Sequence, residues 1–401
     1  MSGDSTDAAS TGSQPPTPNP EAMARAIEVA RRGAGSVSPN PPVGAVAVRD
    51  GEILGEGWHG SFGGPHAERD LIERLIASRG ADACRGADLY VTLEPCAHHG
   101  KTPPCSDAVI AQDFARVFVG CDDPNPLTTG RSYAQFAAAG ISVVRGVEES
   151  SARALIAGYL CRHHASRALV TAKWAMTADG RIATATGDAR WISADETRAE
   201  TRRERSTYDA ILVGIGTVRA DNPDLTARTE GVGNPARVVL DSTLSIDLQT
   251  RLVASAAETP LLVLGSAAHA TDANFEERRR ALEAVSVEVA VLPAVGGHVP
   301  PLTILEELAR RGHATVLVEG GGRVHGAFLA AGLIDRVQII VAPKLCGGES
   351  APGPVGGRGL GRMAEAPTIV DPIWRQVGQD MILEGSVTPA GRGEWPRSAS
   401  G

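Results

Sequence analysis

Three short segments decide how this sequence is understood: Pro65-His66-Ala67-Glu68, Leu93-Glu94-Pro95-Cys96 and Pro103-Pro104-Cys105. One imidazole and two thiolates suit zinc, a borderline-soft ion, and three protein ligands leave a fourth position open for water. Glu68 stands two residues after the histidine, where its carboxyl group can transfer protons without binding the metal. The segments therefore predict a catalytic zinc site with His66, Cys96 and Cys105 as ligands and Glu68 as acid and base.

The spacing of the two cysteines limits the classes of substrate that the site can be expected to bind. Zinc nucleobase deaminases use the same division of labour, and Pro-Cys-x-x-Cys is their common second half. Here eight residues separate Cys96 from Cys105, so a loop is needed, and that loop can face the substrate. His98, His99 and Lys101 lie in it and offer donor or cationic groups to a phosphorylated substrate. Lys101 is equally compatible with a solvated loop charge.

The composition describes a globular chain of more than one domain. A length of 401 residues favours two or three domains. A net charge of −8 with 4% aromatic residues argues against nucleic-acid binding. Six cysteines, two of them predicted metal ligands, do not suggest a disulfide framework. Because no stretch is long and apolar enough to span a bilayer, we expect a cytoplasmic protein without a membrane partner.

The order of polar and apolar segments indicates two α/β domains between disordered tails. We expect tails at 1–20 and 387–401, a zinc domain at 21–146 and a second domain at 147–386. In the first domain Asp50-Gly51 predicts a type I′ hairpin, and helices are expected to begin at His66 and Cys105. Its other expected elements are helices at 21–31 and 131–139, strands at 87–93, 116–120 and 141–145, and a connecting helix at 148–162.

From Ala168 onward, predicted strands and helices alternate. Strands are expected near 168–174, 209–214, 236–241, 260–265, 287–292, 314–319 and 335–342, and helices near 193–206, 274–285, 302–311 and 323–331. Ser193-Ala-Asp-Glu196 predicts a capping box at the first of these helices. Glycine clusters at 214–216 and 320–322 can approach phosphates closely, but neither completes G-x-G-x-x-G, so we reject a Rossmann fingerprint.

The run from Glu94 to Cys105 closely resembles the deaminase half of the bifunctional riboflavin-biosynthesis deaminase-reductases. So do Pro39-Asn40-Pro41-Pro42-Val43-Gly44 and Asp123-Pro124-Asn125-Pro126. In the second half the resemblance rests on Lys173-Trp-Ala-Met-Thr-Ala-Asp-Gly-Arg181, Trp191-Ile-Ser193, Thr217-Val-Arg-Ala-Asp-Asn-Pro223, Asp241-Ser242, 319–327 and Ala342-Pro-Lys-Leu345. The similar region extends from residue 20 to residue 386.

The resemblance implies a cytidine-deaminase-like α/β/α sandwich followed by a dihydrofolate-reductase-like α/β domain. It implies zinc-dependent hydrolytic deamination of 2,5-diamino-6-ribosylamino-4(3H)-pyrimidinone 5′-phosphate. The second implied step is NADPH-dependent reduction of 5-amino-6-ribosylaminouracil 5′-phosphate to the ribitylamino product. One zinc ion per chain and NADPH are the implied cofactors, and a small phosphoribosyl pyrimidine is the implied partner. The oligomeric state stays open, a homo-oligomer included.

Position by position, the resemblance also assigns site residues. The implied NADPH contacts are Ala175, Trp191, Thr217, Asp221, Ser242, Gly321, Gly322, Arg323, Val324, His325, Gly326 and Ala327. The substrate contacts are Asn40, His98, His99, Lys101, Ala189, Arg205, Leu225, Arg228 and Glu319. Ala189 stands where relatives often carry a serine that touches the substrate. Lys173, Asp221 and Glu319 are the candidate proton sources of the reduction, and the sequence does not rank them.

Two other functions are compatible with parts of the sequence. One is a zinc deaminase of another nucleobase or nucleoside, with a C-terminal domain that binds a nucleotide without catalysis. The spacing of Cys96 and Cys105 and the acidic net charge disfavour it. The other is a structural zinc module whose C-terminal half senses a pyridine nucleotide. Glu68 disfavours this second function, because a closed structural site would use a fourth protein ligand.

Overall fold

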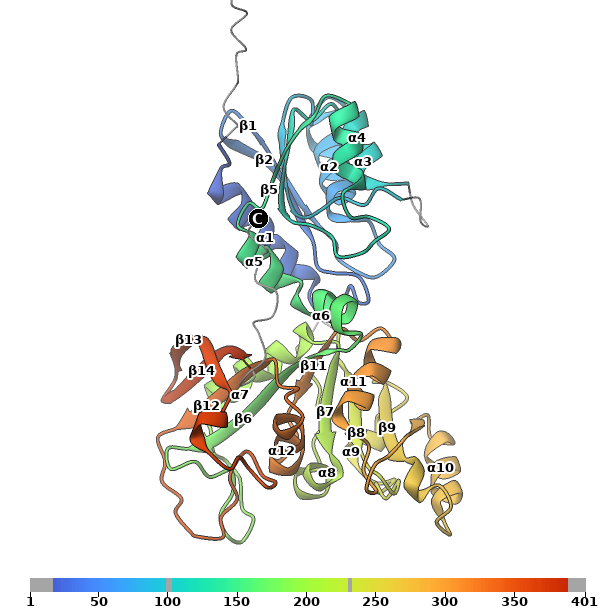
Figure 1. The fold of residues 1–401 in the computed structure, drawn as a ribbon, viewed down its shortest axis with the longest axis vertical. Helices are drawn as coiled ribbons and strands as arrows, with labels where there is room; N and C mark the ends of the chain where they lie inside the picture. The colour runs from blue at the N-terminus through green and yellow to red at the C-terminus, as the bar shows by residue number, and fades with distance from the viewer. Residues whose placement is uncertain (1–16, 99–102, 230–232, 389–401) are drawn as a thin grey trace, which may run out of the picture. The chain divides into compact units, whose positions relative to one another are not determined.

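A computed structural model describes residues 17–98, 103–229 and 233–388 (Figure 1). Within them the chain divides into two compact units. The first joins the segment that ends at Gly33 to Pro42–Ile156, and the second joins Ala34–Pro41 to the segment that begins at Ala157. The break after Ile156 lies inside the predicted connecting helix, and the predicted domain limits stay a prediction. In the described part of the chain, no helix is long and apolar enough to cross a membrane.

The first unit is built on a five-stranded sheet with the order β2-β1-β3-β4-β5. β1 pairs antiparallel with β2 and β3, whereas β3, β4 and β5 are parallel. Positive φ angles of 53° at Asp50 and 82° at Gly51 confirm the predicted turn between β1 and β2. The strands are β1 Gly44–Arg49, β2 Glu52–Trp58, β3 Asp88–Leu93, β4 Arg116–Cys121 and β5 Ser142–Arg145.

Helices cover both faces of this sheet, because successive strand residues point to opposite sides. Ala45 and Ala47 of β1 belong to the core that includes α2, α3 and α4, whereas Val46 and Val48 pack in the core with α1. The result is the predicted α/β/α sandwich (Figure 1). The helices are α1 Pro20–Ala30, α2 Ala67–Arg79, α3 Cys105–Ala111, α4 Arg131–Ala138 and α5 Glu149–Leu155, with a 3₁₀ turn η1 at Arg31–Gly33.

The second unit has a nine-stranded sheet with the order β10-β9-β8-β7-β11-β6-β12-β14-β13. The seven predicted strands are present and parallel to one another, and the last two strands add an antiparallel hairpin that the sequence did not predict. The strands are β6 Leu169–Thr177, β7 Ala210–Gly214, β8 Ala236–Leu240, β9 Leu261–Ser266, β10 Glu288–Leu292, β11 Thr315–Val318, β12 Arg336–Ala342, β13 Thr368–Val377 and β14 Asp380–Thr388.

Two apolar cores lie on the two faces of the larger sheet. Side chains of α11 and α12 belong to one core, and those of α8, α9 and α10 belong to the other. The helices are α6 Ala157–Ala165, α7 Asp195–Glu204, α8 Ile215–Asp221, α9 Arg251–Ala254, α10 Phe275–Glu283, α11 Pro301–Arg310 and α12 Gly322–Ala330, with 3₁₀ turns η2 Arg205–Thr207, η3 Ala267–His269 and η4 Met363–Glu365.

Two helix predictions need correction. The connecting segment 148–162 forms two helices, α5 and α6, which are interrupted at Ile156. The predicted capping box is absent, because α7 begins at Asp195 and its N-cap is Ala194, which has no capping side chain. The carboxylate of Asp380 at the start of β14 accepts a hydrogen bond of 2.7 Å from the Ala194 amide instead. A tertiary contact therefore replaces the local cap.

The order of the larger sheet places two glycine turns next to each other. Because β11 lies between β6 and β7, the chain that leaves β7 continues to β8 on one side, whereas the chain that leaves β11 continues to β12 on the other side. Crevices form at such points, beyond the carboxyl ends of parallel strands. A Cβ atom on Gly320 would lie 2.9 Å from the Gly214 nitrogen. Glycine at position 320 thus allows the loops after β7 and β11 to approach closely.

Gly57 sets the distance between β2 and α2 in the first unit. A Cβ atom at this position would lie 2.3 Å from the Leu71 nitrogen and 2.6 Å from the Ala67 carbonyl oxygen. Both are backbone atoms of the first two turns of α2, which cannot rotate away as a side chain would. The close packing therefore positions the beginning of this helix, where His66 and Glu68 lie.

The substitution Gly57→Ala should destabilise the first unit and weaken zinc binding. Overpacking costs about 1–3 kcal/mol, and the value here should lie at the upper end because backbone atoms must move. Thermal unfolding and zinc content would be measured together, and Gly60→Ala is the matched control. A Cβ atom at Gly60 meets only the Trp58 side chain at 3.5 Å, an ordinary contact. Equal unfolding temperatures for the two variants would contradict the role of Gly57.

Candidate functional site

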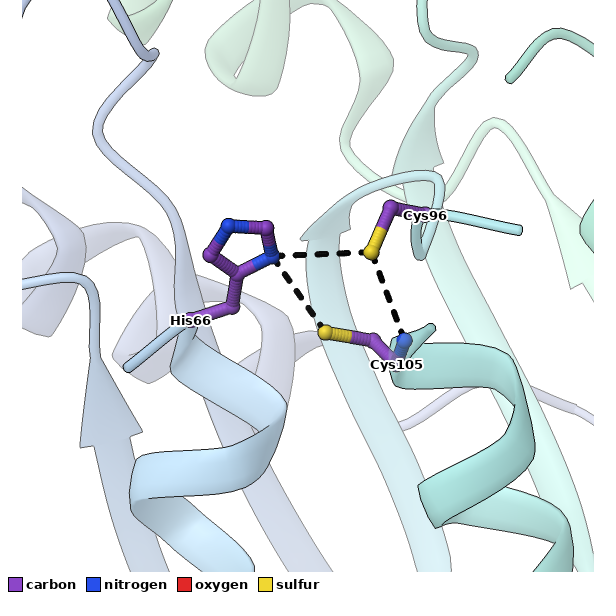
Figure 2. Close-up of side chains that lie close together, drawn as sticks. All are labelled: His66, Cys96 and Cys105. Atoms are coloured by element: carbon purple, nitrogen blue, oxygen red, sulfur yellow. Dashed lines mark hydrogen bonds between the residues drawn. The ribbon is translucent and has the colours of Figure 1, made fainter. Parts of the chain in front are cut away.

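The predicted zinc ligands come from three separate elements that meet at one edge of the smaller sheet. His66 directly precedes α2 as its N-cap, Cys105 is the first residue of α3, and Cys96 follows the carboxyl end of β3 (Figure 2). The positive end of a helix dipole favours a thiolate. The Cys105 amide at the start of α3 also donates a hydrogen bond of 3.3 Å to Cys96 Sγ.

The ligand atoms have the separation that a tetrahedral zinc ion requires. His66 Nδ1 lies 3.6 Å from Cys96 Sγ and 3.4 Å from Cys105 Sγ, and the three atoms all lie within 4.8 Å of one another. Typical zinc–nitrogen and zinc–sulfur bonds in a tetrahedron place such atoms about 3.6 Å apart. The donor set and its spacing therefore fit zinc with one open coordination position. In the described part of the chain, no other cluster of this kind occurs.

The pKa values of the two cysteine thiols are shifted in opposite directions. The Cys105 thiol hydrogen-bonds to Cys96, and this bond together with the His66 imidazole lowers the pKa of Cys96 to about 4. The same hydrogen bond and burial raise the pKa of Cys105 well above its usual value. The hydrogen bond to Cys96 also raises the pKa of His66. Cys96 is thus the thiol that ionises more readily, and the thiolate is the form that binds a metal ion.

Glu68 lies beside the ligands but outside the cluster that they form. It occupies the first turn of α2 and is only 3% exposed. Burial, followed by the negative charge of Cys96, raises the pKa of its carboxyl group to about 6. A carboxyl group that titrates near neutral pH both accepts and donates protons readily. Its place and its environment agree with the predicted acid–base role.

The surroundings of this site contain one histidine that sequence reasoning missed. His59 is 2% exposed, donates from Nδ1 to the Pro65 carbonyl oxygen at 2.8 Å, and packs edge-on against the His66 ring at 5.3 Å. Burial lowers the pKa of His59. Nothing in its spacing separates it from an ordinary core histidine. It supports the turn that delivers His66 to the site.

Only part of the predicted substrate contacts of this site can be placed. His98 Nδ1 lies 3.4 Å from the Thr128 hydroxyl group, so the segment after Cys96 contacts the loop after β4. His99 and Lys101 lie outside the described residues. Asn40 belongs to Ala34–Pro41, which clusters with the second unit. The substrate roles of these four residues stay predictions.

A large cavity opens in the second unit at the carboxyl ends of the parallel strands. Its volume is about 1310 Å³, above the roughly 300–1,000 Å³ of most small-molecule pockets. The lining comes from the loops after β6, β7, β8, β10, β11 and β12. Both predicted glycine clusters contribute to it. The size and the glycine turns fit an extended dinucleotide.

Most predicted cofactor contacts line this cavity, and four do not. The lining includes Thr217, Asp221, Ser242, Gly321, Gly322, Arg323, Val324 and Ala327, and also the predicted substrate contact Ala189. Ala175, Trp191, His325 and Gly326 are not among the lining residues. The His325 ring lies between the carbonyl oxygens of Val318 and Pro354. The Trp191 ring is exposed and lies 4.4 Å from the Arg198 guanidinium carbon.

Two predicted residues from distant parts of the sequence contact a third, Glu319, which directly follows β11. Arg205 donates to its two carboxylate oxygens at 2.9 and 2.8 Å, and Lys173 Nζ of β6 lies 3.9 Å away. Burial alone would raise the pKa of Glu319, but Arg205 and Lys173 outweigh it and hold the pKa at about 2. Glu319 is therefore ionised at neutral pH. Asp221 lies apart from this cluster, and burial raises its pKa.

The loop after α8 carries the remaining predicted substrate contacts and is unusually strained. Asn222, Leu225 and Arg228 all have positive φ angles, of 42°, 56° and 52°. Non-glycine residues in this region cluster at functional sites. Arg205 donates to the Thr226 carbonyl oxygen at 3.0 Å, so the same guanidinium group holds this loop and Glu319. Leu225 is buried, and Arg228 pairs with Asp224.

Both halves of the chain match family models. Residues 17–121 match the cytidine and deoxycytidylate deaminase zinc-binding region. Residues 168–383 match the RibD C-terminal domain, which is more than half of the chain.

Full-length relatives support both matches. The riboflavin biosynthesis protein RibD of Actinobacillus pleuropneumoniae is 38% identical over 362 residues, covering 90% of this chain and 93% of the relative. The protein of that name from Escherichia coli strain K12 is 36% identical over 374 residues, covering 90% and 97%.

Solved structures extend the similarity to the fold. A diaminohydroxyphosphoribosylaminopyrimidine deaminase/5-amino-6-(5-phosphoribosylamino)uracil reductase from Thermotoga maritima is 37% identical with a TM-score of 0.79. The alignment covers 92% of this chain and 98% of that one. Acinetobacter baumannii RibD is 34% identical with a TM-score of 0.79 and the same coverage.

Proposed function

The chain belongs to the RibD family of bifunctional riboflavin-biosynthesis deaminase-reductases, and we propose that residues 21–146 deaminate the substrate and residues 147–386 reduce it. The first substrate is 2,5-diamino-6-ribosylamino-4(3H)-pyrimidinone 5′-phosphate, and the second is 5-amino-6-ribosylaminouracil 5′-phosphate. The proposal is supported most directly by the closely spaced imidazole and two thiols beside the buried Glu68.

In the deamination, His66, Cys96 and Cys105 would hold one zinc ion. When bound, zinc supplies a water molecule activated for attack on the ring carbon that carries the amino group. Glu68 accepts a proton from the attacking water and delivers it to the ring nitrogen. Glu68 then takes the remaining proton from the hydroxyl group added to the ring carbon and passes it to the amino group, which leaves as ammonia as the C–N bond breaks and the ring carbonyl forms. A carboxyl pKa of about 6 suits both directions of transfer.

In the reduction, residues of the cavity beyond the carboxyl ends of the strands, Thr217, Ser242 and Gly321 among them, would hold NADPH. When bound, NADPH would supply the hydride for C1′ of the opened ribosylamine, and the nitrogen of the product takes up a proton. Lys173 is the proton source in this proposal. Glu319 has a pKa of about 2 and carries no proton to give at neutral pH, so it holds the Lys173 ammonium group and Arg205 in place.

The zinc content of the protein tests the ligand set. Because the three ligands belong to one domain, we expect one zinc ion per chain, measured by elemental analysis after dialysis. Cys96→Ser should lose the metal, since a serine hydroxyl group does not ionise at neutral pH and is a poor replacement for a thiolate. Cys346→Ser, outside the cluster, is the control and should keep it. A metal-free wild-type protein with full deaminase activity would refute the assignment.

The substitution Glu68→Gln tests the proton transfer separately from metal binding. The amide preserves the shape of the side chain and leaves the three ligands intact, so zinc should stay bound. Ammonia release should fall about 10²–10⁴-fold, the usual contribution of a general acid–base group. Glu73→Gln on the exposed face of α2 is the matched control and should retain activity. Turnover of Glu68→Gln within a few-fold of wild type would exclude Glu68.

The two reactions should be severable by reciprocal substitutions. Glu68→Gln, given the deaminated substrate, should oxidise NADPH at the wild-type rate, because Lys173 and the cavity belong to the second unit. Lys173→Met should release ammonia normally, while NADPH oxidation falls about 10²–10⁴-fold. The activity that each variant retains shows that the variant is folded. Loss of NADPH oxidation in folded Glu68→Gln protein would contradict two independent sites.

A further inference from the structure

The cavity of the second unit has a part remote from the reacting groups. Lys173 and Glu319 belong to β6 and to the end of β11. The sheet continues from β11 to β7, β8, β9 and β10, and lining residues extend along this direction as far as Val295–Ile304. With neighbouring strands about 4.8 Å apart, the turn after β8 lies about 10 Å from β11. A dinucleotide whose nicotinamide lies near Glu319 must place its adenosine half toward β8–β10.

One arginine lies at the turn after β8 and contacts it. Arg219, in the last turn of α8, is exposed and lines the cavity. Its Nη2 atom donates a hydrogen bond of 2.7 Å to the Ser245 hydroxyl group. The other arginine of the lining, Arg323, lies in the first turn of α12 directly after the glycines at the end of β11. Arg219 therefore lies against the turn after β8, whereas Arg323 lies beyond the end of β11.

The turn after β8 presents hydroxyl groups and hides its carboxylate. Asp241 is 1% exposed and accepts hydrogen bonds from the Ser245 hydroxyl at 3.0 Å and from the Ile246 amide at 2.7 Å. The Ser242 hydroxyl lines the cavity and makes no hydrogen bond within the described part of the chain. Arg278 of α10 donates to the Thr243 carbonyl oxygen of the same turn at 3.1 Å, which adds positive charge beside it.

We propose that Arg219, held by Ser245, binds the 2′-phosphate of NADPH together with the Ser242 hydroxyl group and distinguishes NADPH from NADH. The inference rests on the proposed use of NADPH in the second unit. An enzyme that selects NADH offers a carboxylate to the free 2′-hydroxyl group of the adenosine ribose, whereas an arginine accommodates the 2′-phosphate. Here the carboxylate of the turn is committed to its own backbone and to Ser245. Arg219 and Ser242 line the cavity, and Ser245 holds the Arg219 guanidinium group.

Binding of NADP⁺ and NAD⁺ to the full-length, zinc-loaded protein tests this role without turnover. Isothermal titration calorimetry of Arg219→Gln should show NADP⁺ affinity about 10–100-fold weaker, the range for a lost charge-assisted hydrogen bond. NAD⁺ affinity should stay the same, which also shows that the variant is folded. The fragments 2′,5′-ADP and 5′-AMP should follow NADP⁺ and NAD⁺ respectively.

Two further variants complete the test. Arg280→Gln on α10 removes the same charge from a side chain that is 75% exposed and absent from the cavity lining, so it should change neither affinity. Arg219→Lys keeps the charge without the planar fork and should recover part of the NADP⁺ affinity.

Two outcomes would overturn the inference. One is an unchanged ratio of NADP⁺ to NAD⁺ affinity in Arg219→Gln, which includes an equal loss for both nucleotides, and the other is a wild-type protein that binds the two equally. If the wild-type protein binds neither nucleotide, the proposed use of NADPH fails instead, so the two failures can be told apart.

Discussion

Parallel pairing of strands decides where chemistry can occur in both units. A parallel strand must be followed by a crossover that leaves from its carboxyl end, so all such loops gather at one edge of the sheet. Cys96 follows β3 of the smaller sheet at this edge. Thr217, Ser242 and Gly321 follow β7, β8 and β11 of the larger one. A metal-dependent hydrolysis and a hydride transfer thus use the same geometric constraint with different side chains.

The zinc site could be predicted from the sequence because it is encoded locally. Its ligands lie between residues 66 and 105, each next to the start of a helix or the end of a strand that has a clear pattern. The cluster of Lys173, Arg205 and Glu319 could not be assembled in this way. Its geometry depends on the insertion of β11 between β6 and β7, and no local pattern encodes the order of strands in a sheet. Only the resemblance to a family selected these residues in advance.

Two of the misses in secondary structure, the β13–β14 hairpin and the capping box, are connected. β13 contains Pro372 and a positive φ angle at Asp371, and its register with β14 shifts between Val370 and Ile373. These features obscure the alternation of polar and apolar residues by which a strand is identified. The capping box failed because Asp380, at the start of the missed strand β14, binds the Ala194 amide. Because the β13–β14 hairpin was not predicted, the contact between Asp380 and the Ala194 amide could not be predicted either.

Two buried glutamates show how environment assigns roles to one residue type. Both are removed from water, which alone raises the pKa of a carboxyl group. Glu68 has a pKa of about 6 and can carry a proton near neutral pH, whereas Glu319, between Arg205 and Lys173, has a pKa of about 2 and stays ionised. The first is suited to transfer protons and the second to hold cations. Pairs of carboxyl groups with opposite shifts are how enzymes separate these tasks.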